Sequence, residues 1–131
     1  MSPKYFTLTE ANELLPTIVP LVNQLLEKRA KVSHMRSQMP ELMQDYRSNV
    51  GNAETSIMVQ EFTAIEQLMT QIQSYGCVIK SISAGLVDFL ANQNGRDVYL
   101  CWQYGESEVS HYHDLDAGFN GRKPISDYQS F

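Results

Sequence analysis

The chain has 131 residues, the length of one domain, and 43% of them are hydrophobic while 19% are charged. This composition is typical of a globular protein, because disordered chains carry fewer apolar residues and more net charge. A net charge of −5 argues against a nucleic-acid partner, since neutralising phosphates requires a basic face. The two cysteines, Cys77 and Cys101, are too few for a disulfide scaffold and indicate a reducing compartment.

The N-terminal residues lack the basic start and apolar stretch of a secretory signal. The most apolar segment, Leu14–Val22, contains two prolines and is much shorter than the ~20 residues that span a bilayer. We therefore expect a cytoplasmic protein with a single domain over 1–131 and no membrane partner.

A capping box begins the first predicted helix. The Thr7 hydroxyl can accept a hydrogen bond from the Glu10 amide, while the Glu10 carboxylate can accept one from the Thr7 amide. Apolar residues follow at alternating spacings of four and three, as on one face of an amphipathic helix. They are Ala11, Leu15, Ile18, Val22 and Leu25.

Three prolines, Pro16, Pro20 and Pro40, lie within the first helical stretch. Each removes a helical hydrogen bond and clashes with the preceding turn, so the helix should bend there. A second, shifted apolar stripe continues the pattern through Val32, Met35, Met39, Leu42 and Tyr46. We therefore expect one bent helix over 7–47.

Turn-prone residues at 48–52 separate this helix from a second one predicted over 54–75. Its apolar stripe has the heptad-like spacing of a coiled coil and consists of Met58, Phe62, Ile65, Met69 and Ile72. Gly76 stands where a left-handed residue would end the helix. Two such helices with a short connection pack antiparallel, which predicts a long helical hairpin. Because a hairpin leaves apolar flanks uncovered, we also expect a homodimer.

Short runs rich in β-branched and aromatic residues follow the second helix. They cover residues 77–80, 85–89, 97–102 and 108–113. Asn92–Gly95 is a turn signal that predicts a hairpin between the second and third runs. The sequence therefore predicts an α+β fold, in which the helical hairpin precedes a small antiparallel β-sheet over 77–113 and a glycine-punctuated C-terminal loop over 114–131.

Most of the reactive side chains lie between residues 101 and 122. His111 and His113 would point to the same face of a strand, and such a pair is half of a zinc or other transition-metal site. Oxygen ligands could come from nearby carboxylates, which are Glu106, Glu108 and Asp114. Pairs of this kind also occur on ordinary exposed strands, so a divalent metal is one of two interpretations.

Cys101 and the glycine-rich loop at 118–122 also have two interpretations each. Cys101 could be a nucleophile if a nearby cation lowered its pKa, but its strongly apolar neighbours favour a small buried hydrophobe. The segment Gly118–Arg122 could cradle an anion through backbone N–H groups beside a fixed cation. Alternatively, Arg122 pairs internally with Glu106 or Asp114.

Specific motifs occur in order along most of the chain. Near the start they are Tyr5–Ala11 and Leu14–Pro16. In the tail they are Gly85–Phe89, Gly95–Trp102, Gly105-Glu106, His113 and Gly118–Pro124. Together they resemble an uncharacterised prokaryotic family, domain of unknown function 2203. The matching tail positions are Cys101, Trp102, Gly105, Glu106, His113, Gly118, Phe119, Gly121 and Arg122.

The resemblance implies a small cytoplasmic protein with no assigned activity. His113 belongs to the family pattern and His111 does not. The resemblance therefore favours a site built from Glu106, His113 and Arg122 over a site built from the histidine pair.

Two functions from different classes remain open, and whether the chain is an enzyme is undecided. In the preferred hypothesis it is a structural or protein-interaction protein, with a Glu106–Arg122 ion pair and aromatic core anchors at Trp102, Tyr112 and Phe119. In the alternative it is a small enzyme or a metal- or anion-binding module. That alternative requires Glu106, His113 and Arg122 to converge on an open pocket.

Overall fold

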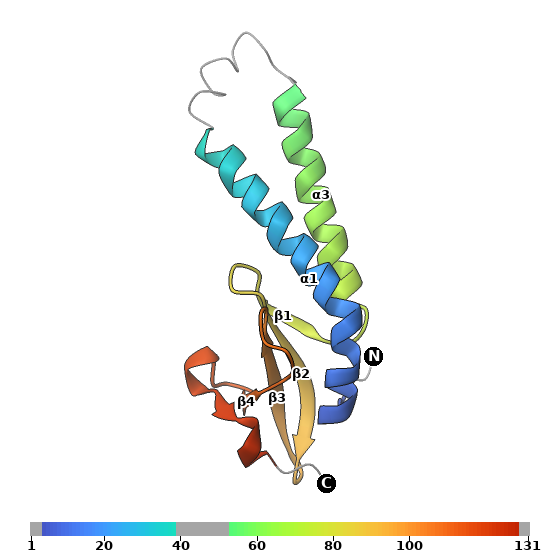
Figure 1. Cartoon of the computed structure of the whole chain (residues 1–131), viewed down its shortest axis with the longest axis vertical. Coiled ribbons are helices and arrows are strands. Elements are labelled where there is room, and N and C mark those ends of the chain that lie inside the picture. Colours follow the sequence, from blue (N-terminus) through green and yellow to red (C-terminus); the bar gives the residue numbers. More distant parts are fainter. Residues whose placement is uncertain (1–3, 39–52, 129–131) are drawn as a thin grey trace.

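The computed structural model describes residues 4–38 and 53–128. Within these residues, two helices precede a five-stranded antiparallel sheet, which confirms the predicted α+β fold (Figure 1). The helices are α1 (Leu8–Ser37) and α3 (Ala53–Gln73). The strands are β1 (Val78–Ser81), β2 (Leu86–Gln93), β3 (Arg96–Gln103), β4 (His111–Asp114) and β5 (Lys123–Pro124).

Helix α1 begins at the predicted capping box, with Thr7 N donating to Glu10 Oε1 at 2.9 Å and Glu10 N donating to Thr7 Oγ1 at 3.1 Å. All five residues of its predicted first stripe are buried. Pro16 and Pro20 lie inside the helix without ending it. Instead, the blue and cyan parts of α1 run in different directions in Figure 1, as expected of a bent helix. The helix ends at Ser37 with Gln38 as its C-cap, and residues 39–47 of the predicted 7–47 stretch lie outside the described residues.

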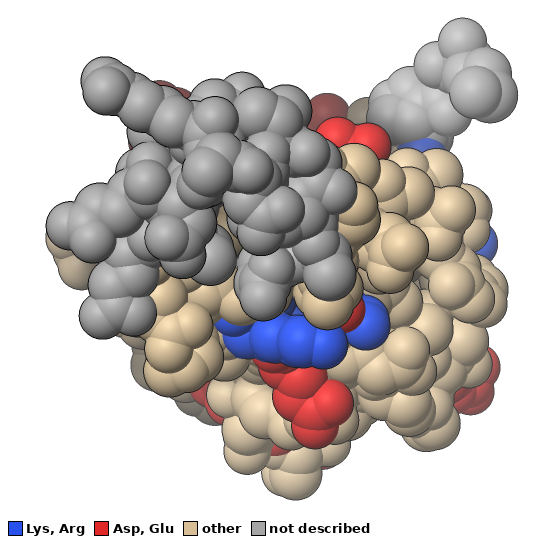
Figure 2. Space-filling view, turned by 90° about the horizontal axis from the view of Figure 1, so that it is seen from above, with Lys and Arg blue, Asp and Glu red and all other residues tan. Residues whose placement is uncertain are grey.

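The predicted stripe of α3 is confirmed at Met58 and Ile72, which are buried, but not at Phe62. Phe62 is 43% exposed, and Glu61 is buried beside Met58 and Leu68. Glu61 faces inward because two lysines of α1 pair with it. Lys28 and Lys31 each place Nζ 3.1 Å from a Glu61 carboxylate oxygen. In the view from above, basic side chains lie against acidic ones on this face of the molecule (Figure 2). Neither described helix has the length and apolar character needed to cross a membrane.

The sheet is a meander in the order β1-β2-β3-β4-β5. The predicted hairpin between β2 and β3 is confirmed: Asn94 and Gly95, with φ of 55° and 85°, form its two-residue left-handed turn. Side chains alternate between the two faces of the sheet. One face packs into the core with α1 and α3, through Val87, Phe89, Ala91, Val98, Leu100, Trp102 and Tyr112.

The C-terminal segment is more ordered than the loop predicted over 114–131. Short 3-10 turns occur at Phe119–Gly121 and Ile125–Asp127. Between them β5 pairs with β4, in the register His111↔Pro124. The predicted loop thus contains one strand, β5, which the sequence did not reveal because two residues are too few to give a periodic pattern. The pairing folds the tail along the side of the sheet opposite to α1 (Figure 1).

Candidate metal centre

Three ligand-type side chains meet on the sheet face opposite to the helical core. They are Asp88 of β2, Cys101 of β3 and His113 of β4, and each is at most 5% exposed. The antiparallel register places Asp88 beside Cys101 and Tyr99 beside His113, on one face of three adjacent strands. One ligand atom from each residue lies within 4.8 Å of the other two. Oxygen, sulfur and nitrogen donors therefore form one buried cluster.

The His113 ring is held between two hydrogen-bond acceptors. Its Nδ1 lies 2.7 Å from the Asp114 backbone carbonyl, and its Nε2 lies 3.0 Å from Asp88 Oδ2. A carbonyl oxygen only accepts, so Nδ1 is the donor to Asp114, and Nε2 faces the Asp88 carboxyl group. Metal-bound histidines are usually oriented in this way, with one nitrogen donating to a carbonyl and the other facing the ion.

Both acids of the cluster resist ionisation. Burial raises the pKa of Asp88, and the neighbouring His113, Cys101 and Lys80 oppose this only in part. Burial, together with the Asp88 charge, raises the pKa of Cys101 to about 12. Asp88 Oδ1 has no hydrogen-bond partner among the described residues. Without an added cation Cys101 is thus a protonated thiol and not an activated nucleophile.

The cluster faces a cavity of about 330 Å³ between the sheet and the tail. Asp88, Cys101 and His113 contribute to its lining, together with Lys80 and Asp116. The remaining lining residues are apolar or small, namely Leu86, Leu115, Ala117, Gly118 and Phe119. A ligand bound at the cluster would therefore have space beside it.

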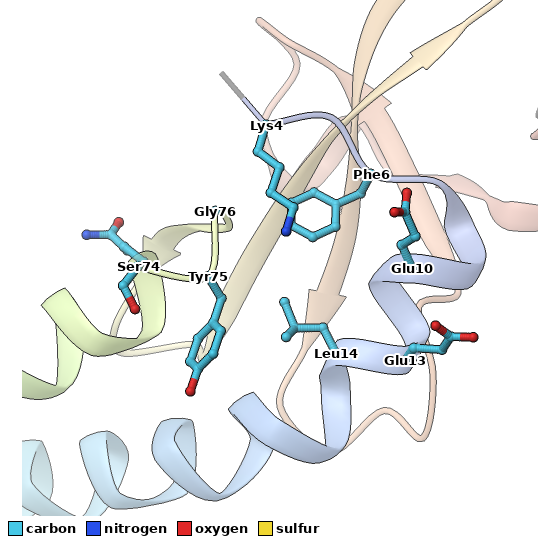
Figure 3. Close-up of a pocket in the computed structure, with 9 residues that line it drawn as sticks. Lys4, Phe6, Glu10, Glu13, Leu14, Ser74, Tyr75 and Gly76 are labelled. Carbon is cyan, nitrogen blue, oxygen red and sulfur yellow. The ribbon is translucent and has the colours of Figure 1, made fainter. Parts of the chain in front are cut away.

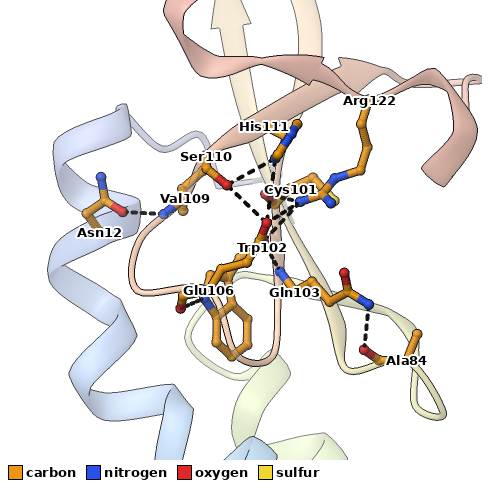
Figure 4. A network of polar contacts seen from close by, with 10 residues as sticks. All are labelled: Asn12, Ala84, Cys101, Trp102, Gln103, Glu106, Val109, Ser110, His111 and Arg122. Atoms are coloured by element: carbon orange, nitrogen blue, oxygen red, sulfur yellow. Dashed lines mark hydrogen bonds and ion pairs between the residues drawn. The ribbon is translucent and has the colours of Figure 1, made fainter.

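Glu106 and Arg122 belong to a second, adjoining network (Figure 4). Arg122 Nη2 donates to both carboxylate oxygens of Glu106, at 2.9 and 3.1 Å. Glu106 also accepts from the backbone N–H of Gln103 at 2.6 Å and from Ser110 Oγ at 3.0 Å. The ion pair expected in the structural hypothesis is confirmed, and it closes the turn that follows β3.

The two remaining predicted site residues also lie outside the cluster. His111 shares its strand face with His113, but its Nδ1 lies 3.6 Å from Glu106 Oε2, within the second network. The Asp114 carboxylate pairs with Arg96 and lies 4.0 Å from Lys123 Nζ. The five predicted residues thus divide among three arrangements, and His113 is the member of the cluster.

Arg122 connects the second network to the cavity. Its Nη2 lies 3.5 Å from the Cys101 carbonyl, and its guanidinium lies 5.0 Å from the centre of the Phe119 ring. Phe119 lines the cavity and is 47% exposed, so the prediction that it is a core anchor was wrong, whereas Trp102 and Tyr112 are buried as expected. Glu106 and Arg122 therefore position the backbone of one cluster residue and a wall of the cavity.

A larger hollow of about 750 Å³ lies between the start of α1 and the end of α3 (Figure 3). Two of the charged side chains that line it, Glu10 and Lys4, have structural partners. Glu10 completes the capping box, and Lys4 Nζ lies 4.9 Å from the centre of the Phe6 ring. Among the described residues, no group of His, Cys, Asp and Glu side chains in this hollow lies close enough together to hold a metal ion, as Asp88, Cys101 and His113 do.

Comparison with known proteins places the chain in a family. Residues 4–125 match the model of the family described as "Uncharacterized conserved protein (DUF2203)". The chain belongs to this family. Among curated proteins and among solved structures, none is significantly similar to it. Membership in DUF2203 confirms the resemblance inferred from the motifs, and it assigns no activity.

The sequence did not lead us to predict Asp88 as a site residue. It did lead us to consider Cys101 as a nucleophile and to predict His113 as part of a site. One local signal was present: Asp88 is a charged residue in the middle of the otherwise apolar run Gly85–Phe89. A buried carboxylate is rarely retained in such a position without a partner. Its partner, however, is 25 residues away in the sequence and is brought to it by strand pairing.

Proposed function

We propose that the protein binds a divalent transition-metal ion, of which zinc fits best, through Asp88, Cys101 and His113. The observation that carries this proposal is the convergence of their three ligand atoms within 4.8 Å of one another. Zinc is bound by this mixture of carboxylate, thiolate and imidazole donors, and softer or harder ions prefer more uniform sets.

The charges of the cluster support a cation there. A divalent ion would balance the carboxylate of Asp88 and the thiolate of Cys101, whose pKa values are raised by burial. It would also give Asp88 Oδ1 a partner and would replace the hydrogen bond between Asp88 and His113. Three protein ligands leave one position of a tetrahedral ion open, which is the pattern of catalytic and ligand-binding zinc sites.

Metal analysis tests the proposal. Untagged protein purified without chelators should contain close to one zinc per chain by elemental analysis. His113→Ala and Cys101→Ser should abolish the binding. The matched controls are His111→Ala, on the same strand face, and Cys77→Ser, the other buried cysteine. A cobalt-loaded sample should show a thiolate-to-cobalt charge-transfer band that disappears in Cys101→Ser.

Two results would contradict the metal proposal. One is parent protein that remains free of metal after incubation with zinc or cobalt. The other is equal metal content in the cluster variants and the controls, which would place the ion elsewhere on the chain.

We also propose that the helical hairpin has a protein-interaction role, with homodimerisation in the cytoplasm. Large apolar side chains of α3 support it, since Ile57, Val59 and Phe62 are 40%, 59% and 43% exposed. The two buried free cysteines are consistent with a reducing compartment. Light scattering should give a dimer mass that Phe62→Glu lowers and Thr70→Glu does not. A monomeric parent would contradict dimerisation.

A further inference from the structure

We infer that the open coordination position and the cavity beside it bind a small organic molecule with one metal-binding donor group and an apolar body. This inference rests on the proposed metal centre and adds the class of its ligand. It depends on the shape of the cavity, the polarity of its walls and the exposure of two side chains.

The cavity has the size and the polarity of a ligand site. Its volume of about 330 Å³ lies at the lower end of the roughly 300–1,000 Å³ typical of small-molecule pockets. The three donors form a polar end, while Leu86, Leu115 and Phe119 provide apolar walls. Such a combination fixes a ligand through one polar group and binds the rest of it by burial.

Two large apolar side chains of the tail are left uncovered beside this cavity. Leu115 is 48% exposed and Phe119 is 47% exposed. Single exposed apolar residues are common, but these two line the same cavity within five residues of chain. An apolar ligand body between them would bury surface that water now contacts.

Phe119 is held in place before any ligand arrives. The Arg122 guanidinium lies 5.0 Å from the centre of its ring, and Glu106 accepts two hydrogen bonds from Arg122 Nη2. Fixing a wall in advance lowers the entropy lost on binding. Glu106 and Arg122 are therefore positioning residues. They hold the Phe119 ring at the wall of the cavity and do not contact the metal.

The charges around the cavity favour a ligand with little net charge. A divalent ion would neutralise the Asp88 carboxylate and the Cys101 thiolate. The two other charged lining residues, Lys80 and Asp116, have opposite signs. A neutral or singly anionic donor group, such as a hydroxamate or a thiolate, satisfies this balance, whereas a multiply charged phosphate does not.

Two hydroxamates with the same donor group and different bodies provide the test. Benzohydroxamate and acetohydroxamate are titrated into the full-length cobalt-loaded protein, and the cobalt d–d spectrum is recorded. We expect both to change the spectrum and benzohydroxamate to bind at least about tenfold more tightly, because its ring buries apolar surface. Phe119→Ala should reduce this ratio, whereas Phe62→Ala, which removes a similarly exposed ring on α3, should not.

The outcomes of this experiment separate a failure of the ligand inference from a failure of the proposed metal centre. Failure to load cobalt contradicts the metal centre itself. Cobalt that loads but does not respond to either hydroxamate overturns the inference and leaves the metal centre intact. Equal dissociation constants for the two hydroxamates also overturn it. Leu115→Ala provides a second variant of the apolar wall, and the ratio is compared among variants that retain cobalt.

Discussion

His113 Nε2 and Asp88 Oδ2 lie 3.0 Å apart, within hydrogen-bond distance, on a buried face of the sheet. The other ring nitrogen donates to the Asp114 carbonyl, so the orientation of the ring is fixed from both sides. This pair connects β2 to β4 across β3, and it supplies two of the three proposed metal ligands.

In metal-free protein, Asp88→Ala should lower the free energy of unfolding by about 3 kcal/mol, because it leaves a buried polar group without its partner. Asp88→Asn keeps a hydrogen-bonding group of the same shape and should cost less than half as much. Urea denaturation in the presence of a chelator measures both values. An alanine variant as stable as the parent would show that the pair contributes nothing to the fold.

Both thiols should be unreactive in the folded protein. Burial raises the pKa of Cys77 to about 11 and that of Cys101 to about 12, so the thiolate is scarce at pH 8. Ellman's reagent should therefore label neither cysteine within minutes under native conditions, and both after unfolding in urea. Rapid labelling of native Cys101 would mean that the thiol is open to solvent or activated.

Stability should fall with rising pH above about pH 9, in part because of Cys77. An exposed thiol has a pKa of 9.0, whereas burial raises the pKa of Cys77 to about 11. Between these values the unfolded state binds fewer protons than the folded state, so the free energy of unfolding decreases as pH rises. The contribution of Cys77 should be about 1 kcal/mol between pH 8 and pH 10.

Comparison with Cys77→Ala isolates this contribution, because lysine and tyrosine side chains titrate in the same range. Urea denaturation at pH 8, 9 and 10 should give a shallower decrease for the variant than for the parent. Parallel curves would show that the Cys77 thiol ionises alike in the folded and unfolded states.

Glu61 should determine how α1 and α3 fit together more than how stable they are. Lys28 and Lys31 are 38% and 55% exposed and stay hydrated without Glu61, while leucine removes the desolvation cost of the carboxylate, so Glu61→Leu should leave the thermal midpoint unchanged or raise it. Replacing both Lys28 and Lys31 by methionine leaves the buried carboxylate unpaired and should lower the midpoint. Calorimetry measures both, and a large loss in Glu61→Leu would contradict this account.

Gly85 and Gly95 form a matched pair for testing a close contact. Both have left-handed φ, 66° and 85°, which costs a residue with a side chain about 1–2 kcal/mol. A Cβ at Gly85 would also lie 2.7 Å from Tyr104 Cβ, whereas one at Gly95 would meet nothing within 4 Å. Gly85→Ala should therefore lower the free energy of unfolding by at least about 1 kcal/mol more than Gly95→Ala. Equal losses in urea denaturation would show that the strand ends can move apart.

Most local features of the fold could be predicted from the sequence. The capping box at Thr7, the buried stripe of α1 and the turn at Asn94-Gly95 each depend on residues close together in the chain. The side-chain periodicity of helices and strands then follows from backbone geometry. The ion pair of Glu106 with Arg122 was also expected, because the set of available partners was small.

The candidate site was predicted only in part. His113 was predicted as a site residue from the histidine pair and the family resemblance, whereas Cys101 was interpreted as a small buried hydrophobe. Asp88 had no partner nearby in the sequence, and Glu106 and Arg122 were predicted both as candidate site residues and as an ion pair. The inward position of Glu61 was missed for the same reason, since its two lysines lie on the other helix.

The sequence by itself determined the order and type of the elements and the short-range turns and caps, because their energies come from neighbouring residues. Only the tertiary structure decided which side chains meet. The register of β2, β3 and β4 places Asp88, Cys101 and His113 on one face, and the pairing of β5 folds the tail over them. These contacts depend on long-range strand pairing, which short-range sequence patterns do not specify.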